Sequence, residues 1–117
     1  MSLERVLKTL ENFGLTKKDA KAYVYLAKKG PKEGKDIAIA LNLTQPQLTS
    51  TLVRLQKKGF IHTSAQCPDL FSAFTFEQIL DMMIAIKDEE AQAVRETHEE
   101  LLSSWGAIPE KNKPTNV

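Results

Sequence analysis

The chain has 117 residues, enough for one domain with a modest core, and its 42% apolar and 26% charged residues are ordinary for a soluble globular protein. It has no apolar run of the roughly 18 or more residues that a membrane span needs, and its single cysteine excludes an internal disulfide and a multi-cysteine zinc site. Residues 1–76 carry 12 Lys and Arg against 6 Asp and Glu, whereas residues 77–117 carry 4 against 9. These numbers predict a cytoplasmic protein whose first part meets a polyanion.

Three short helices are predicted before residue 43. The first ends at Gly14, and the second begins after Thr16, a good N-cap, and ends at Gly30. The third covers about residues 33–41, and Asn42 can take the left-handed position that ends a helix.

The stretch Thr44–Gly59 carries the clearest helix signals of the chain. Thr44 and Gln47 have the spacing of a capping box, and Pro46 stands in the first turn, where its missing N–H costs nothing. Leucines at positions 48, 52 and 55 share one face of a helix, and Gly59 suits a left-handed stop. Only two residues separate this helix from the third, which predicts a helix-turn-helix.

Opposite the leucines, this helix carries hydrogen-bonding side chains and no carboxylate. Glutamine can pair with adenine and arginine with guanine in the major groove, while hydroxyls reach bases or phosphates and lysines neutralise phosphates. The alternative is an ordinary solvated helix face, since lysines also simply keep a surface soluble. The candidate DNA-binding residues are Gln45, Gln47, Thr49, Ser50, Arg54, Lys35, Lys57 and Lys58, and Lys17, Lys18 and Lys32 are further candidates for phosphate contacts.

After Gly59 the pattern becomes that of short strands. Runs rich in β-branched or aromatic residues at 60–63 and 70–74 enclose a tip at 65–69, which predicts a β-hairpin. A helix-turn-helix followed by a hairpin is a winged helix-turn-helix, which we assign to residues 1–76. At the tip, Cys67 could be a redox switch or form a crosslink to a second subunit, but no neighbour in the sequence clearly favours the thiolate and Asp69 opposes it. An unreactive exposed thiol is therefore expected.

Residues 76–105 are predicted to form one long helix with apolar side chains at alternating spacings of four and three, as in a coiled-coil seam. Lys87 and His98 are polar positions that weaken the seam, and His98 is interpreted as a register-setting residue rather than a metal ligand. The predicted homodimer interface comprises Leu80, Ile84, Ala91, Val94, His98, Leu101 and Trp105. Residues 77–105 thus form a dimerisation segment, and residues 106–117, with two prolines, form a flexible tail.

The ordered set of motifs resembles a known family. The motifs are Phe13-Gly14-Leu15-Thr16, Ala20, Tyr23-x-x-Leu26, Gly30-Pro31, Ile37-Ala38 and Leu55-x-Lys57-Lys58-Gly59-Phe60-Ile61. Together they are similar to the N-terminal winged-helix domain of the TrmB-like archaeal transcription regulators, over about residues 5–80. The resemblance implies DNA binding through the helix that begins after Thr44 and dimerisation through the helix after the hairpin.

Two departures from the family bear on function. The chain stops before the large effector domain of the sugar-sensing members could begin, so neither such a domain nor a small-molecule effector is expected. The family commonly has basic residues near positions 45 and 47 and in its wing, whereas this chain has glutamines there and no cation at residues 65–69.

The sequence therefore leaves two hypotheses open. The leading one is a sequence-specific, DNA-binding transcriptional regulator that acts as a homodimer. The alternative is a winged-helix protein–protein interaction module of the transcription machinery, which the uncharged wing favours. No phosphate loop, nucleophile elbow or metal-ligand pattern is present, so neither catalysis, nor a metal, nor a cofactor is expected.

Overall fold

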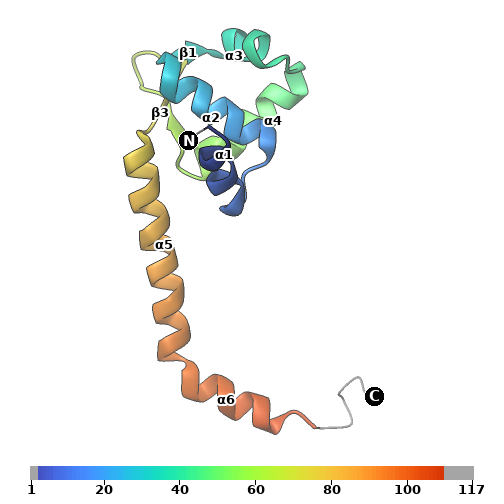
Figure 1. Cartoon of the computed structure of the whole chain (residues 1–117), viewed down its shortest axis with the longest axis vertical. Coiled ribbons are helices and arrows are strands. Elements are labelled where there is room, and N and C mark those ends of the chain that lie inside the picture. The colour runs from blue at the N-terminus through green and yellow to red at the C-terminus, as the bar shows by residue number, and fades with distance from the viewer. Residues whose placement is uncertain (1–2, 110–117) are drawn as a thin grey trace. The chain divides into compact units, whose positions relative to one another are not determined.

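The computed structural model describes residues 3–109 and divides the chain into two compact units, Met1–Leu80 and Asp81–Val117 (Figure 1). The elements in chain order are α1 (Leu3–Asn12), α2 (Lys17–Lys29), β1 (Lys32–Glu33), α3 (Gly34–Leu41), α4 (Gln45–Lys57), β2 (Ile61–His62), β3 (Leu70–Ala73), α5 (Phe76–Glu96) and α6 (His98–Ala107). The first unit is mostly helical with a small antiparallel sheet, which confirms the predicted winged helix-turn-helix.

The first unit begins its helices where the sequence placed caps. The Thr16 hydroxyl accepts a hydrogen bond from the Asp19 N–H at 3.0 Å and starts α2. At α4 the capping box is complete, because the Gln47 N–H donates to the Thr44 hydroxyl at 3.3 Å and the Thr44 N–H donates to Gln47 Oε1 at 2.9 Å. Asn42 ends α3 in the left-handed conformation, with φ 57° and ψ 53°. The turn from α3 to α4 is therefore short and fixed at both sides.

The core of the first unit surrounds α2, which contacts α1, α3, α4 and β3 (Figure 1). The Tyr23 ring meets Phe60 edge-on, with centroids 5.6 Å apart, and its hydroxyl donates to the Phe74 carbonyl at 2.6 Å. Burial raises the pKa of Tyr23 to about 12, so it stays a hydrogen-bond donor at neutral pH. The buried apolar residues of this unit are Leu10, Leu15, Ala20, Ala22, Tyr23, Leu26, Ile37, Leu48, Leu52, Leu55, Phe60, Ile61 and Ile79.

The sheet has three strands in the order β1-β3-β2, all antiparallel. The hairpin of β2 and β3 confirms the predicted wing, with Ile61 opposite Ala73. The third strand was not predicted, because β1 is only two residues long and follows Pro31 without an alternating pattern. It places Lys32 opposite Phe71. The wing sheet thus includes one cation from outside the hairpin.

The C-terminal helix differs from the prediction of one helix over residues 76–105. Thr75 caps α5 by accepting from the Gln78 N–H at 3.1 Å, but the helix ends at Glu96 and α6 begins at His98. Thr97 lies between them with φ −103° and ψ 10°, and its hydroxyl donates back to the Ala93 carbonyl at 2.9 Å. Such a bond competes with the helix ladder and bends helices, which accounts for the interruption.

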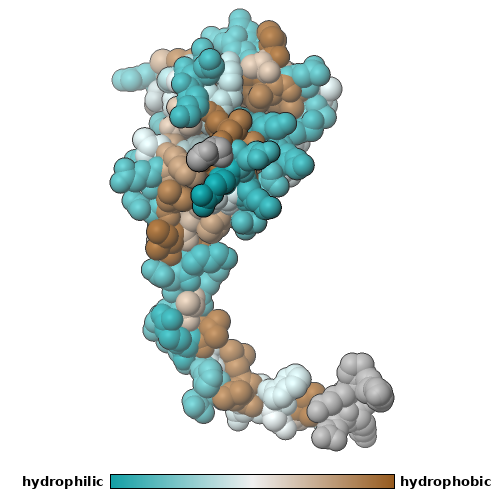
Figure 2. All heavy atoms as spheres, viewed as in Figure 1, coloured by the Kyte–Doolittle hydropathy of each residue, from teal (hydrophilic) through white to brown (hydrophobic). Residues whose placement is uncertain are grey.

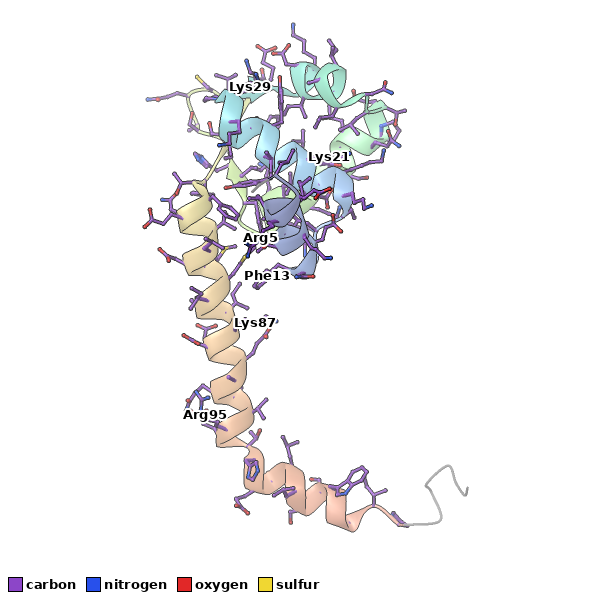
Figure 3. All side chains as sticks on the ribbon, viewed as in Figure 1. Arg5, Phe13, Lys21, Lys29, Lys87 and Arg95 are labelled. Atoms are coloured by element: carbon purple, nitrogen blue, oxygen red, sulfur yellow. The ribbon has the colours of Figure 1, made fainter. Side chains whose placement is uncertain are left out.

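Apart from Met83, which is 2% exposed, the large apolar side chains of the second unit are mostly exposed. Apolar and hydrophilic residues alternate along α5 and α6 in the space-filling view (Figure 2), and α6 has no buried residue. Polar side chains satisfy one another along the helix, since Arg95 donates to Gln92 Oε1 at 2.7 Å and Lys87 lies 3.5 Å from a Glu90 oxygen (Figure 3). In the described part of the chain, no helix is both long and apolar enough to cross a membrane.

The predicted flexible tail falls mostly outside the described residues. Gly106 and Ala107, which were assigned to the tail, belong to the last turn of α6. Residues 110–117 lie outside the described part of the chain.

Candidate nucleic-acid interface

The candidate interface is built on α4, which exposes one polar face while its other face enters the core. Leu48, Leu52 and Leu55 are buried as predicted, but Thr51 is also buried, with 1% of its surface exposed. Its hydroxyl has no hydrogen-bond partner among the described residues. A helix turns about 100° per residue, so the added threonine moves the centre of the buried stripe toward the side that faces α2.

This shift changes which residues stand at the outermost line of the helix. Ser50 and Val53 lie near the crest, opposite the centre of the buried stripe, and both are exposed. Gln47 and Arg54 stand instead at the margin beside α2, and Thr49 at the margin beside the wing. The leucine spacing alone placed Gln47 and Arg54 opposite the core, because a threonine was not expected to be part of it.

Arg54 makes the most constrained contact of the interface. Its Nε donates to Asp19 Oδ2 at 2.8 Å and its Nη2 donates to Asp19 Oδ1 at 2.9 Å, a two-bond pair between α4 and α2. The Asp19 side chain is 0% exposed and that of Arg54 is 43% exposed. One end of the guanidinium is therefore buried against the carboxylate, and the other faces outward.

The charges of this pair stabilise one another. Burial alone raises the pKa of the Asp19 carboxyl, but the hydrogen bonds and charge of Arg54, together with Thr16, outweigh burial and hold this pKa below its ordinary value. The hydrogen bond to Asp19 in turn raises the pKa of Arg54. At neutral pH both groups are ionised, and the pair contributes no net charge to the surface of α4.

On the α2 side, the margin of α4 forms an open pocket of about 300 Å³. Three of the predicted DNA-binding residues meet here, and Lys18 of α2 adds a cation. Further along α2, Lys21 and Lys29 are exposed and do not line this pocket (Figure 3). The pocket is lined by Lys18, Pro46, Gln47, Ser50, Thr51 and Arg54.

On the wing side, α4 borders a second open pocket, of about 510 Å³, with a different character. Three more predicted residues, Lys35, Gln45 and Thr49, line it. The carboxylates of Glu33 and Asp69 line it as well, and Lys35 Nζ lies 3.6 Å from a Glu33 oxygen. This side combines apolar walls with at least as much negative as positive charge.

The last two predicted DNA-binding residues lie apart from both pockets. Lys57 and Lys58 are exposed at the C-terminal end of α4, about 18–20 Å from its start at the helical rise of 1.5 Å per residue. Lys58 extends toward the turn before α2, because a methyl group on Gly14 would lie 3.4 Å from its Nζ. The eight predicted residues thus form three groups rather than one cluster.

Two residues of the interface were missed by the sequence. Neither Asp19 nor Val53 was among the candidate residues. A carboxylate near the start of one helix and an arginine 35 positions later give no local pattern, so only the packing of α2 on α4 joins them. Val53 is 43% exposed and lines the pocket on the wing side of α4.

The predicted dimer residues are all exposed in the single chain. Trp105 is 66% exposed, Ile84 59% and Val94 57%. Leu80, Ala91, His98 and Leu101 are exposed as well. Among residues 3–109 no group of three or more His, Cys, Asp or Glu side chains could hold a metal ion.

Known proteins resemble both the sequence and the fold. A curated relative, the HTH-type sugar sensing transcriptional regulator TrmBL1 of Pyrococcus furiosus, is 30% identical over 111 residues, which cover 87% of this chain and 33% of the relative. Among solved structures, TrmBL2, described as an archaeal chromatin protein with a novel mode of DNA binding, superposes with a TM-score of 0.70 at 26% identity. That match covers 97% of this chain and 45% of TrmBL2. The chain thus spans a third of the length of the curated relative.

The fold is more widely shared. The transcriptional regulator PA4135 matches with a TM-score of 0.51 and 20% identity, over 92% of this chain and 85% of that protein, which shows a common fold. The family model of the sugar-specific transcriptional regulator TrmB matches residues 10–77, more than half of this chain. The chain therefore belongs to the TrmB family of transcriptional regulators.

Proposed function

We propose that this protein is a sequence-specific DNA-binding regulator of transcription that binds double-stranded DNA as a homodimer. The observation that carries the proposal is the exposed face of α4. Ser50 and Val53 at its crest and Gln45, Gln47 and Thr49 beside them are exposed, and no carboxylate stands on this face. Such a face presents hydrogen-bonding groups and a methyl-bearing side chain to base edges in a major groove.

Family membership supports the same function. The relatives are named as transcriptional regulators, and TrmBL2 is described as binding DNA. The basic charge of residues 1–76 supplies the attraction to phosphates that precedes sequence recognition. The α4 residues at both margins, with Lys35, Lys57 and Lys58, are the proposed contacts.

The homodimer is proposed from the second unit. Large apolar side chains stay exposed along α5 and α6 of a single chain, and their spacing follows a coiled-coil seam over Leu80–Val94. A second copy is the partner that such a self-similar stripe fits. Two copies would offer their α4 helices to successive major grooves about 34–36 Å apart along one face of a duplex.

Binding of a fluorescent 30-base-pair duplex of random sequence, followed by anisotropy at about 50 and 200 mM salt, tests the proposal. Binding should be strong at the lower salt and fall steeply at the higher, because released counterions drive the association. Ser50→Glu, which places a carboxylate on the crest, should abolish binding. Ala27→Glu makes the same charge change on an exposed position of α2 and should retain binding.

A protein-interaction role is the second candidate, and the pocket between α4 and the wing favours it. Val53, Leu48 and Phe71 give that pocket apolar walls, and Glu33 and Asp69 give it carboxylates that repel a phosphate backbone. If the wild-type protein leaves the duplex free at 50 mM salt, DNA binding is wrong, and this pocket becomes the leading contact surface.

A further inference from the structure

The outward end of Arg54 has capacity for another acceptor. A guanidinium has five N–H groups, and two of them bind Asp19, so three remain. Because the inner end is held by a two-bond pair to a fully buried carboxylate, the orientation of the outer end is fixed. Arg54 is therefore a preorganised donor whose position does not depend on a ligand.

The position of this donor decides what it can reach. Arg54 stands at the margin of α4 beside α2, whereas a base-reading side chain needs to stand near the crest that enters the groove. The walls of a major groove are the two phosphate backbones, so the margin of a helix in the groove faces phosphates. Lys18 comes to the same pocket from α2, and Ser50 adds a hydroxyl.

We propose that the pocket between α2 and α4 seats one phosphate of the DNA backbone, held by Lys18, the Ser50 hydroxyl and the outer edge of Arg54, while Asp19 keeps that edge in place. This inference rests on the proposed DNA binding and assigns Arg54 to backbone contact rather than to guanine. Since Asp19 neutralises Arg54, Lys18 supplies the net charge of the site. Base discrimination then falls to Ser50, Val53 and the residues next to them.

The division of roles predicts a specific pattern of salt dependence. Lys18→Ala removes one net charge at a phosphate, so the slope of log K against log salt should become shallower by about 0.9, with roughly fivefold to tenfold weaker binding near 0.1 M salt. Lys21→Ala, one turn further along the same helix and outside the pocket, should leave the slope unchanged. Asp19→Asn frees the charge of Arg54 and should make the slope steeper by up to about 0.9. A purely structural role of Asp19 would weaken binding without steepening the slope.

Two duplexes separate phosphate contact from guanine contact. Arg54→Lys keeps a cation for Asp19 but cannot bind the carboxylate and a phosphate with separate edges. It should weaken binding by a similar factor on a 30-base-pair duplex of A·T pairs only and on one of mixed sequence. A loss confined to the mixed duplex would assign Arg54 to guanine and overturn the inference.

Anisotropy titrations of all four variants on both duplexes, each at several salt concentrations from 50 to 200 mM, test the inference, and a melting curve verifies that each variant is folded. If wild type binds and Lys18→Ala and Arg54→Lys match it in affinity and slope, the pocket holds no phosphate, although the proposed function stands. If the wild-type protein binds neither duplex at 50 mM salt, the proposed DNA binding is wrong, and the inference that rests on it is wrong as well.

Discussion

The two units of the chain differ in where their apolar side chains lie. In the first unit, leucines from α1, α2 and α4 and the ring of Tyr23 are buried, and the charge of Asp19 is buried against one edge of the Arg54 guanidinium. In the second unit, the side chains of Val94, Leu101 and Trp105 are more than half exposed. The first unit buries most of its large apolar side chains, whereas most of those in the second unit lie on its surface. The following variants should therefore affect one unit and spare the other.

Leu55→Ala should cause the largest loss, in the first unit only. Leu55 is 0% exposed, and truncating a fully buried leucine lowers the free energy of unfolding by about 2–5 kcal/mol. Urea unfolding followed by circular dichroism measures the loss, and light scattering should give an unchanged mass. Val53→Ala, on the exposed side of the same helix, should change stability by less than about 0.5 kcal/mol. Equal losses in both variants would contradict the assignment of the core.

Leu101→Asp should have the next largest effect, in the second unit only. In the proposed dimer the exposed apolar side chains of α6 are covered by the second copy, where a carboxylate is poorly solvated, so association should weaken by about 2–3 kcal/mol and the mass should fall to that of a monomer. Ser103→Asp adds the same charge to another exposed position of α6 and should leave the mass unchanged. If light scattering finds both variants at the wild-type mass, the copies meet through another surface.

Acid should weaken the first unit through the buried pair. Because the pKa of Asp19 is lower in the folded state than in the unfolded chain, its stabilisation is present above the ordinary carboxyl value and is lost as pH falls through the folded value. Asp19→Asn loses the charged acceptor of the Arg54 hydrogen bonds and should be less stable than wild type by about 1.5–3 kcal/mol near pH 7. This difference should shrink below about pH 4. Thermal melts of the two proteins from pH 7 to pH 3 measure it, and a constant difference would show that the carboxylate charge contributes nothing.

Several features of the fold follow from local sequence, and others do not. The caps at Thr16 and Thr44 and the left-handed residue Asn42 were predicted, because each depends on side chains within a few positions. The strand β1 was not, since two residues carry no period and its pairing with β3 spans much of the domain. The break at Thr97 was missed because the apolar spacing continues through it, whereas the cause is a hydroxyl that bonds to the backbone.

The candidate site was predicted as a set of residues but not as an arrangement. Charge and composition favour α4 as the contact helix, because they are properties of one helix face. The neutralisation of Arg54 by Asp19 and the burial of Thr51 depend on how α2 packs against α4. These contacts join residues more than thirty positions apart, and no pattern within either helix encodes them.

Tyr23→Phe should have a smaller effect on the first unit. It deletes the hydroxyl that binds the Phe74 carbonyl but keeps the ring against Phe60. The free energy of unfolding should fall by about 1–2 kcal/mol, because one hydrogen bond is lost and the carbonyl is left without this partner. Tyr25→Phe is the matched control, because Tyr25 is only partly buried. Urea unfolding that ranks the two variants equally would contradict a stabilising role for this bond.

Thr97→Ala should have the smallest effect and only in the second unit. Alanine removes the hydroxyl that donates to the Ala93 carbonyl and favours a helix by roughly 0.5 kcal/mol over threonine. The helical signal at 222 nm should rise slightly, while the melting temperature of the first unit stays the same. An unchanged signal would mean that the break at residue 97 has another cause.

The pairing of β1 with β3 also makes the segment between them a closed loop. Lys32 and Phe71 face each other across the sheet, so the chain that contains α3, α4 and the hairpin leaves and returns at the same place. Closing such a loop lowers the conformational entropy of the chain, and this cost grows only slowly with loop length. A single closure therefore constrains the whole segment. If β1 separated from β3, the start of α3 and the wing would both lose this attachment at the same time. Their amide protons should therefore exchange with solvent as one cooperative group.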